Sequence, residues 1–425
     1  EYESLLVAGT VPPGEDDMNY FAAENNVVPH IIPQMSREIS LKDALTVWKL
    51  YRLFRRERPD VVHTHTAKAG TVGRISGMLY RWLTPRVLLG RPRPCRFVHT
   101  YHGHIFHSYY GKFKTRIFLG IEKALARLAT DSIVVISAQQ YREIHEEYGV
   151  GRASQFSVIP LGLDVSVFAA WQAKRHLLRE ELGVNSEDVL VGIVGRLTEI
   201  KNHALFLRVI RRYKETRGLA LDGGGRVRFV VIGDGHLRGA LEEQSHAAGL
   251  GEDVTFLGTR ANPENFYPAL DIVALTSLNE GTPLTLIEAM ANARAVIATA
   301  VGGVVDLLGE PLTRSSSRNE SQAGTREGDG FVVCERGVRV SPNQEEAFCA
   351  GLARLVAEQD LRRELGERGR RFVERQYSKE RLLADVIKLY DELIQREPGE
   401  SKVWSLESKE KLSSDSRLQT PDSRL

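Results

Sequence analysis

Cysteines, long apolar runs and metal-ligand spacings are scarce in this sequence of 425 residues. Its three cysteines, Cys95, Cys334 and Cys349, are too few and too scattered for a disulfide framework, and they show no metal-type spacing. No apolar run approaches the roughly 18 residues of a transmembrane helix. The opening segment, Glu1–Val7, lacks the basic and apolar regions of a signal peptide. These absences favour a cytoplasmic protein without disulfides and without a metal site.

Positive charge is concentrated in one part of the chain, although the formal net charge is only +2. From Ser36 to Arg127 there are 19 Lys and Arg against 5 Asp and Glu, a balance of +14 that leaves −12 for the rest. Such a segment either faces an anionic partner or is an ordinary solvated surface. Because no nucleic-acid-binding motif accompanies the charge, nucleic acid is not expected as a partner.

Short β-branched runs alternate with amphipathic helical stretches, which is the pattern of parallel sheets covered by helices. Helices are expected over Leu41–Arg56, with Ser40 as the N-cap, and over Lys379–Gln395. The chain is long enough for two such domains. The expected strands are Ser4–Ala8, Val27–Ile32, Asp60–His65, Arg96–Tyr101, Ser132–Ile136 and Phe156–Ile159 in the first half, and Val189–Gly195, Arg226–Gly233, Asp253–Leu257, Asp271–Thr276 and Ala295–Thr299 in the second.

A domain boundary is expected within Pro160–Phe168, because this segment has the Pro and Gly residues of a linker. We therefore expect one domain over residues 1–160 and another over 161–396, with a loop insertion at 312–330 and an unpacked tail at 397–425. A doubly wound domain opens with a strand and a Gly-rich turn. Here the first expected strand resembles the second strand of such a domain. We therefore expect that roughly 20 to 30 residues, which carry the first strand and its glycines, are missing from the N-terminus.

The segment from Glu280 to Glu288, EGTPLTLIE, follows an expected strand and opens a helix at Pro283. Open α/β sheets bind ligands at this end of their strands, and a helix N-terminus offers free N–H groups to a diphosphate. Either glutamate could instead be an ordinary surface charge. Glu288, however, lies within the apolar run Leu284–Met290, where an unpartnered carboxylate is costly. This favours a function for Glu288.

The segment Gly195–Asn202, GRLTEIKN, directly follows another expected strand. Its two cations, Arg196 and Lys201, flank the strand-to-helix turn and could reach the same crevice as Glu280 and Glu288. Two cations there would neutralise a diphosphate and stabilise the charge that builds on it as a sugar departs. Basic residues near a turn are usually only solvated. The pair indicates a binding site because the two glutamates are expected at the same edge of the sheet.

With these two pairs, Arg196 with Lys201 and Glu280 with Glu288, the chain resembles the retaining glycosyltransferases of the GT-B fold, specifically glycosyltransferase family 4. The resemblance extends from about Asp60 to Leu393. The stretches Val231–Gly235, Val254–Gly258 and Val158–Asp164 also look like that family. The resemblance implies two doubly wound Rossmann-like domains that face a cleft, with the donor bound mainly by the second domain and the final helix before the tail crossing back to the first. It also implies hexosyl transfer, with retention of configuration, from a nucleotide sugar such as a UDP-sugar to a hydroxyl of a glycan or lipid-linked acceptor. No metal and no other cofactor is expected.

The resemblance also implies roles for single residues. Arg196 and Lys201 would hold the donor diphosphate, Glu288 the ribose hydroxyls and Glu280 the transferred sugar. The pair His102-Gly103 matches a His-Gly pair that faces the reacting sugar in similar proteins, so His102 is expected to contact the donor sugar or the acceptor. We therefore assign His102, Arg196, Lys201 and Glu280 to catalysis, and expect the other nearby histidines to be pocket lining or ordinary loop residues.

The basic segment Tyr110–Leu128 mixes Lys and Arg with Phe, Ile and Leu. As a helix it could lie on an anionic membrane, at the inner face, with Arg81, Arg86, Arg91, Arg93 and Arg96 extending the basic surface. Its apolar residues could equally pack on the sheet. Two other functions remain open at this stage, namely a nucleotide-sugar epimerase or hydrolase of similar shape and a non-catalytic binding protein.

Overall fold

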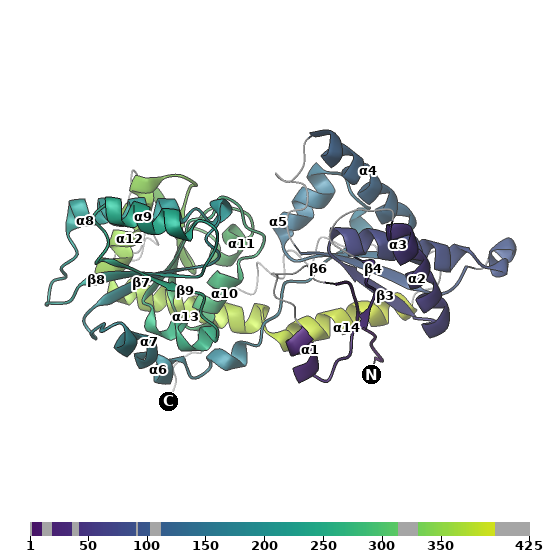
Figure 1. The fold of residues 1–425 in the computed structure, drawn as a ribbon, viewed down its shortest axis with the longest axis horizontal. Coiled ribbons are helices and arrows are strands. Elements are labelled where there is room, and N and C mark those ends of the chain that lie inside the picture. Colours follow the sequence, from purple (N-terminus) through teal and green to yellow (C-terminus); the bar gives the residue numbers. More distant parts are fainter. Residues whose placement is uncertain are drawn as a thin grey trace, which may run out of the picture.

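The structure is a computed structural model that describes residues 2–10, 19–35, 42–90, 92–102, 112–312 and 330–395. Most of the insertion expected at 312–330 and the tail expected at 397–425 lie outside these residues, as does Ser40. The chain forms two α/β lobes, which lie side by side in Figure 1.

The second lobe is built on a seven-stranded sheet in the order β12-β13-β11-β10-β7-β8-β9. All neighbours are parallel except β12 and β13. From β7 the chain moves outward to β8 and β9, and then returns to β10 on the other side of β7 and moves outward again. The strands are β7 (Val189–Val194), β8 (Val227–Ile232), β9 (Val254–Gly258), β10 (Ile272–Leu275), β11 (Ala295–Thr299), β12 (Phe331–Cys334) and β13 (Gly337–Val340).

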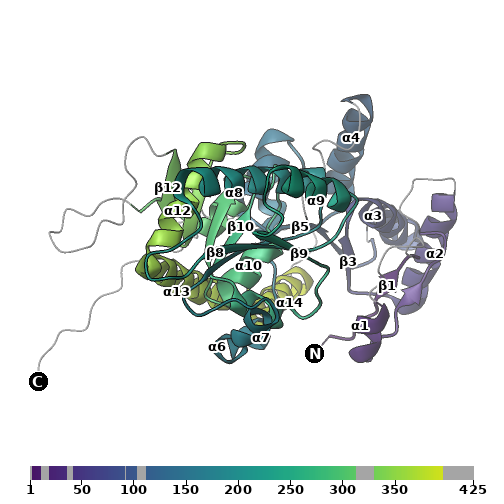
Figure 2. The ribbon, with the colours of Figure 1, turned by 60° about the vertical axis from the view of Figure 1, so that its left-hand side comes forward.

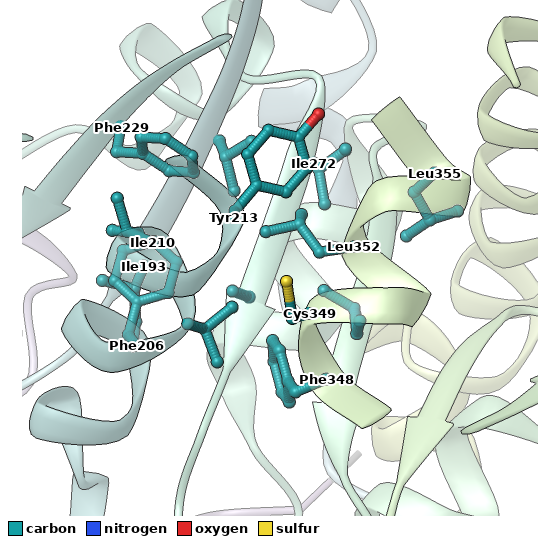
Figure 3. Close-up of a cluster of buried hydrophobic side chains, with 14 of the residues drawn as sticks. Ile193, Phe206, Ile210, Tyr213, Phe229, Ile272, Phe348, Cys349, Leu352 and Leu355 are labelled. Carbon is teal, nitrogen blue, oxygen red and sulfur yellow. The ribbon is translucent and has the colours of Figure 1, made fainter. Parts of the chain in front are cut away.

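Helices cover both faces of this sheet, as Figures 1 and 2 show for α8 and α9 on one side and α10 on the other. The alternation of side chains along each strand separates two cores. Figure 3 shows the first, where Phe206 of α8 and Phe348 of α12 pack with Ile193, Phe229 and Ile272 of the strands. The helices are α6 (Trp171–Lys174), α7 (His176–Glu181), α8 (His203–Arg217), α9 (Arg238–Ala247), α10 (Leu284–Ala291), α11 (Val304–Leu308), α12 (Glu345–Ala357) and α13 (Gln359–Gln376).

The first lobe contains a parallel four-stranded sheet in the order β3-β4-β5-β6, formed by Val61–His65, Arg96–Tyr101, Ser132–Val135 and Phe156–Val158. Two shorter strands, β1 (Val7–Ala8) and β2 (His30–Ile31), pair in parallel as a separate sheet. Within the described residues the strands of this lobe thus form two sheets. The expectation that this domain lacks its first strand and Gly-rich turn stays a prediction.

The helices of the first lobe are α1 (Asn19–Glu24), α2 (Lys42–Glu57), α3 (Ala67–Trp82), α4 (Lys112–Leu128) and α5 (Ala138–Tyr141). The last described helix, α14 (Lys379–Gln395), belongs in part to this lobe. Its Leu389 and Leu393 pack against Val98 and Val134 of the first-lobe sheet. Arg381 at its start donates to the carbonyls of Pro160 and Leu161, at 2.7 and 2.6 Å. The connection between the lobes and α14 therefore hold each other in place.

Candidate active site

The strand order of the second lobe reverses between β7 and β10, and the two motif segments follow these two strands. Arg196 and Lys201 lie in the connection from β7 to α8, and Glu280 lies in the connection from β10 to α10. In open α/β sheets the crevice at such a reversal is the usual ligand site, because the two connections diverge there. The fold thus brings both segments to the one place where a ligand is expected.

Lys201 and Glu280 are in direct contact, with Lys201 Nζ 2.5 Å from Glu280 Oε1. The Ser277 hydroxyl donates to the same carboxylate oxygen at 2.6 Å. The two connections are also joined through their backbones, since Thr276 Oγ1 donates to the carbonyls of Lys201 and Asn202 at 3.0 Å each. The site therefore has one paired cation and anion on a fixed support.

Arg196 lies on a turn that is held by the neighbouring connection after β8. Backbone N–H groups of Gly195 and Leu197 donate to the carbonyls of Ile232 and Asp234, each at 2.9 Å. The close approach requires glycine at 233, where φ is +137° and a Cβ atom would lie 2.0 Å from the Gly195 carbonyl oxygen. The Arg196 side chain is exposed, and it has no side-chain partner within the described part of the chain.

Glu288 lies on α10, one turn into the helix, between the buried residues Ile287 and Ala289. Burial raises the pKa of its carboxyl, and the neighbouring Tyr267 hydroxyl acts against that rise. Tyr267 is itself fully buried. A partly desolvated carboxylate is a strong acceptor for hydroxyl groups. Thr282 and Thr285 at the start of α10 also carry buried hydroxyls without a partner among the described residues.

His102 lies at the end of β4 in the first lobe and contacts a second histidine. His65 Nδ1 is 2.8 Å from His102 Nε2, and the two rings are stacked with centroids 5.0 Å apart. Burial lowers the pKa of both rings, that of His65 to about 4. Among the described residues, no group of three or more His, Cys, Asp or Glu is arranged to hold a metal ion. His104 and His107 lie outside the described residues.

The two lobes contact each other between α11 and α5. Asp306 of α11 accepts the backbone N–H of Gln139 at the start of α5, and Figure 1 shows these two helices facing each other. Burial raises the pKa of Asp306, while this N–H and the nearby Arg142 oppose the rise. The connection just before α11 contacts the glutamate motif, since Gly303 N–H donates to the Gly281 carbonyl at 2.7 Å. The short helix α11 therefore connects the contact between the lobes, at Asp306, to the segment that carries Glu280.

The expected basic surface of the first lobe needs a correction. Arg81 pairs with Asp131 and donates to the Cys95 carbonyl, so its charge is satisfied internally. Arg93 lies over the Tyr80 ring at 4.7 Å, and Arg96 is 3.9 Å from Asp131. These three arginines thus serve the lobe's own packing. Arg91 and the side chain of Arg86 lie outside the described residues.

Fold and site together define a two-domain α/β protein of the GT-B architecture. Family models for "Glycosyltransferase Family 4" and "Glycosyl transferases group 1" match residues 2–167 and 174–322. The UDP-Gal:alpha-D-GlcNAc-diphosphoundecaprenol alpha-1,3-galactosyltransferase of Escherichia coli is 31% identical over 66% of this chain and 68% of its own length. The chain belongs to this glycosyltransferase family.

Other relatives agree over a larger share of the chain. The capsular polysaccharide biosynthesis glycosyltransferase CapM of Staphylococcus aureus is 24% identical over 88% of both chains. HepE from Anabaena, solved in complex with UDP, superposes with a TM-score of 0.68 at 18% identity, over 91% of this chain and 92% of its own. Sucrose-phosphate synthase from Thermosynechococcus elongatus gives 0.64 at 22% identity, over 91% and 88%. The expected fold class is confirmed. No described helix is both long and apolar enough to cross a membrane.

Proposed function

We propose that this glycosyltransferase moves a hexose from a UDP-sugar to a hydroxyl of a lipid-linked or glycan intermediate, with retention of configuration. The observation that carries the proposal is the contact of Lys201 with Glu280 at the strand reversal. In this assignment Arg196 and Lys201 hold the diphosphate, Glu288 accepts from the ribose hydroxyls and Glu280 accepts from the transferred sugar. His102 contacts the donor sugar or the acceptor from the first lobe.

Departure of the diphosphate is the step that these residues assist. As the bond from the anomeric carbon to the phosphate oxygen breaks, negative charge grows on that oxygen, and Lys201 and Arg196 stabilise it. The N-terminus of α10 adds partial positive charge. These groups supply the charge that a metal ion supplies in other enzymes, so neither a metal nor a further cofactor takes part in the proposal.

Attack by the acceptor completes the proposed reaction. The acceptor hydroxyl oxygen bonds to the anomeric carbon on the face from which the diphosphate leaves, and its proton passes to the departing phosphate oxygen. No carboxylate is assigned as a covalent nucleophile, because Glu280 is engaged by Lys201 and Ser277. Retention follows from attack on the same face.

The choice of donor and acceptor is supported by the relatives. The Escherichia coli relative is named for a UDP-galactose donor and a GlcNAc-diphosphoundecaprenol acceptor, and the Staphylococcus aureus relative for capsular polysaccharide biosynthesis. A uridine nucleotide and an acceptor anchored by a polyprenyl diphosphate are therefore the proposed substrate classes.

A lipid-linked acceptor fits a peripheral position at the inner face of the membrane. Helix α4 carries exposed apolar side chains on one stripe, Ile117 (49% exposed), Ile121 (39%) and Leu128 (63%), and Arg116 and Arg127 are exposed beside them. Their spacings of four and seven residues place them on a single helix face. Such a face inserts at the headgroup boundary while the arginines contact anionic lipids.

Vesicle sedimentation tests this membrane contact. The double variant Ile117→Ser/Leu128→Ser is expected to lose binding to anionic vesicles, whereas Leu383→Ser on α14, which is 58% exposed in the wild type, keeps it. Binding should fall in high salt and on neutral vesicles. Equal binding by all three proteins, or by both kinds of vesicle, would refute the assignment of α4.

Incubation of UDP-sugars with and without a polyprenyl diphosphate-linked sugar tests the reaction itself. Transfer is expected only when donor and acceptor are both present, and the new linkage should keep the donor's anomeric configuration by NMR. Conversion of the donor sugar without acceptor would indicate an epimerase, and release of free sugar would indicate a hydrolase. Donor binding without any turnover would indicate a binding protein.

A further inference from the structure

We infer that His65 is a positioning residue for His102. Tyr390 of α14 supports His65 in turn, through His63. This inference rests on the proposed function, because it takes the His102 ring as the group that faces the reacting sugar or the acceptor. It assigns a role to three side chains that come from a first-lobe strand and from the last described helix.

The strand geometry explains why these rings meet. His63 and His65 are two positions apart on β3, so their side chains lie on the same face of the sheet. β4 is the next strand, with His65 in register with Thr100, and His102 follows two residues later. The rings stack in a row, with centroids 4.3 Å apart from His63 to His65 and 5.0 Å apart from His65 to His102.

The contact between His65 and His102 restricts the second ring in two ways. With Nδ1 of His65 2.8 Å from Nε2 of His102, one nitrogen carries the proton and the other accepts it. The tautomer of His102 is thereby coupled to that of His65, and in each of the two arrangements Nδ1 of His102 takes the opposite role to its Nε2. Stacking on His65 also fixes the plane of the His102 ring.

His63 anchors the other end of the row. Its Nδ1 lies 2.6 Å from the Tyr390 hydroxyl of α14, and its Nε2 lies 2.6 Å from Thr100 Oγ1. Both ring nitrogens of His63 are thus engaged, and burial lowers its pKa to about 3, so the ring is neutral near pH 7. Because Leu389 and Leu393 fix α14 on the sheet, Tyr390 is a rigid support.

The histidine on the opposite face of the sheet shows what a purely structural histidine looks like here. His99 is fully buried, and its ring packs edge-on against Tyr101, with the centroids 4.6 Å apart. Its Nδ1 lies 2.9 Å from the Thr64 hydroxyl, and its Nε2 has no hydrogen-bond partner among the described residues. His65, in contrast, is only partly buried and lies at the carboxyl end of β3. Among the described residues, the side-chain hydrogen bond of His65 goes to His102.

Two substitutions at His65 separate positioning from folding. His65→Phe keeps a flat ring for stacking but removes the hydrogen bond, and kcat for glycosyl transfer is expected to fall about ten- to a hundredfold. The KM for the UDP-sugar should change less than threefold, because the residues assigned to the diphosphate and the ribose, Arg196, Lys201 and Glu288, lie in the second lobe. His65→Asn places an amide nitrogen close to the position of Nδ1 and should recover most of kcat.

A double-variant comparison completes the test. In a His102→Ala background, His65→Phe should cause no further loss, because the ring that it positions is gone. Tyr390→Phe should lower kcat two- to fivefold in the wild-type background only. The inference is overturned if His65→Phe matches the wild type, if Asn fails to recover activity while the protein stays folded, or if the losses from His65→Phe and His102→Ala multiply. Absence of transfer by the wild-type protein would instead refute the proposed function.

Discussion

Lys201 and Glu280 are 79 positions apart in the chain, yet Nζ of the first lies 2.5 Å from Oε1 of the second. The contact exists because β7 and β10 are adjacent in the sheet, so the connections that follow them start side by side. Lys201 is thereby held near the strand reversal by a partner that also accepts from Ser277. A donor diphosphate entering there meets a cation whose position is already fixed.

The variant Lys201→Ala should reduce turnover far more than donor binding. Its ammonium group gains most when charge develops on the departing phosphate, so kcat is expected to fall about a hundred- to a thousandfold. The dissociation constant for the donor should rise less than tenfold. Lys214→Ala is the matched control, since Lys214 pairs with Asp253 at the other end of α8. Equal losses in kcat and in donor affinity would contradict a role in the transition state.

The variant Gly233→Ala should destabilise the protein by about 2–4 kcal/mol, because φ is +137° and the new methyl group would collide with the Gly195 carbonyl. Gly239→Ala on α9 meets no atom within 4 Å and should stabilise the helix by up to about 1 kcal/mol. Urea unfolding of the two variants measures this contrast. A Gly233→Ala protein as stable as the wild type would show that the turn carrying Arg196 needs no glycine at 233.

Acidification should destabilise the protein partly through His203, which is 3% exposed and has no hydrogen-bond partner for either ring nitrogen among the described residues. Burial, with a smaller effect from Lys201, lowers its pKa from 6.5 to about 4. Between these two values the unfolded chain binds the proton and the folded chain does not. Above pH 6.5 His203 therefore does not change the free energy of unfolding. Between pH 6.5 and about 4 it lowers the free energy of unfolding by about 1.4 kcal/mol for each pH unit of acidification.

Urea unfolding of the wild type and of His203→Leu from pH 7.5 to 4.5 checks this dependence. The difference in unfolding free energy between the two proteins should be constant above pH 6.5 and should shift in favour of the variant below it. Parallel curves over the whole range would contradict a neutral, buried His203.

The parts of the fold that sequence predicts well are those with a strong local pattern. β11 lies at Ala295–Thr299, as expected from its short β-branched run, and α14 lies at Lys379–Gln395, as expected from its helical periodicity. The sequence pattern does not predict β12 and β13, because each has four residues and only Glu335 and Arg336 separate them. Such a short hairpin lacks a run long enough to distinguish it from a loop.

The candidate site shows a similar division. The order and spacing of Arg196, Lys201, Glu280 and Glu288 place them correctly after β7 and β10, because motif position relative to a strand is a local property. The contact between His63 and Tyr390 spans 327 positions. The return of the last helix to the first domain is expected from the family resemblance, but the position on that helix that meets His63 is not contained in any local pattern. The two-residue spacing of His63 and His65 on a strand was the one available signal.

Calorimetric titration with UDP tests the central claim most directly, namely that the strand reversal of the second lobe binds a nucleoside diphosphate through Glu288. Wild-type protein should bind one equivalent, and Glu288→Gln should raise Kd about ten- to a hundredfold, because an acceptor for the ribose hydroxyls becomes partly a donor. Glu215→Gln, at an exposed position on α8, should leave Kd unchanged. The loss should be smaller with 2′-deoxy-UDP, which lacks one of the two hydroxyls. Equal affinity of wild type and Glu288→Gln for UDP would contradict the site.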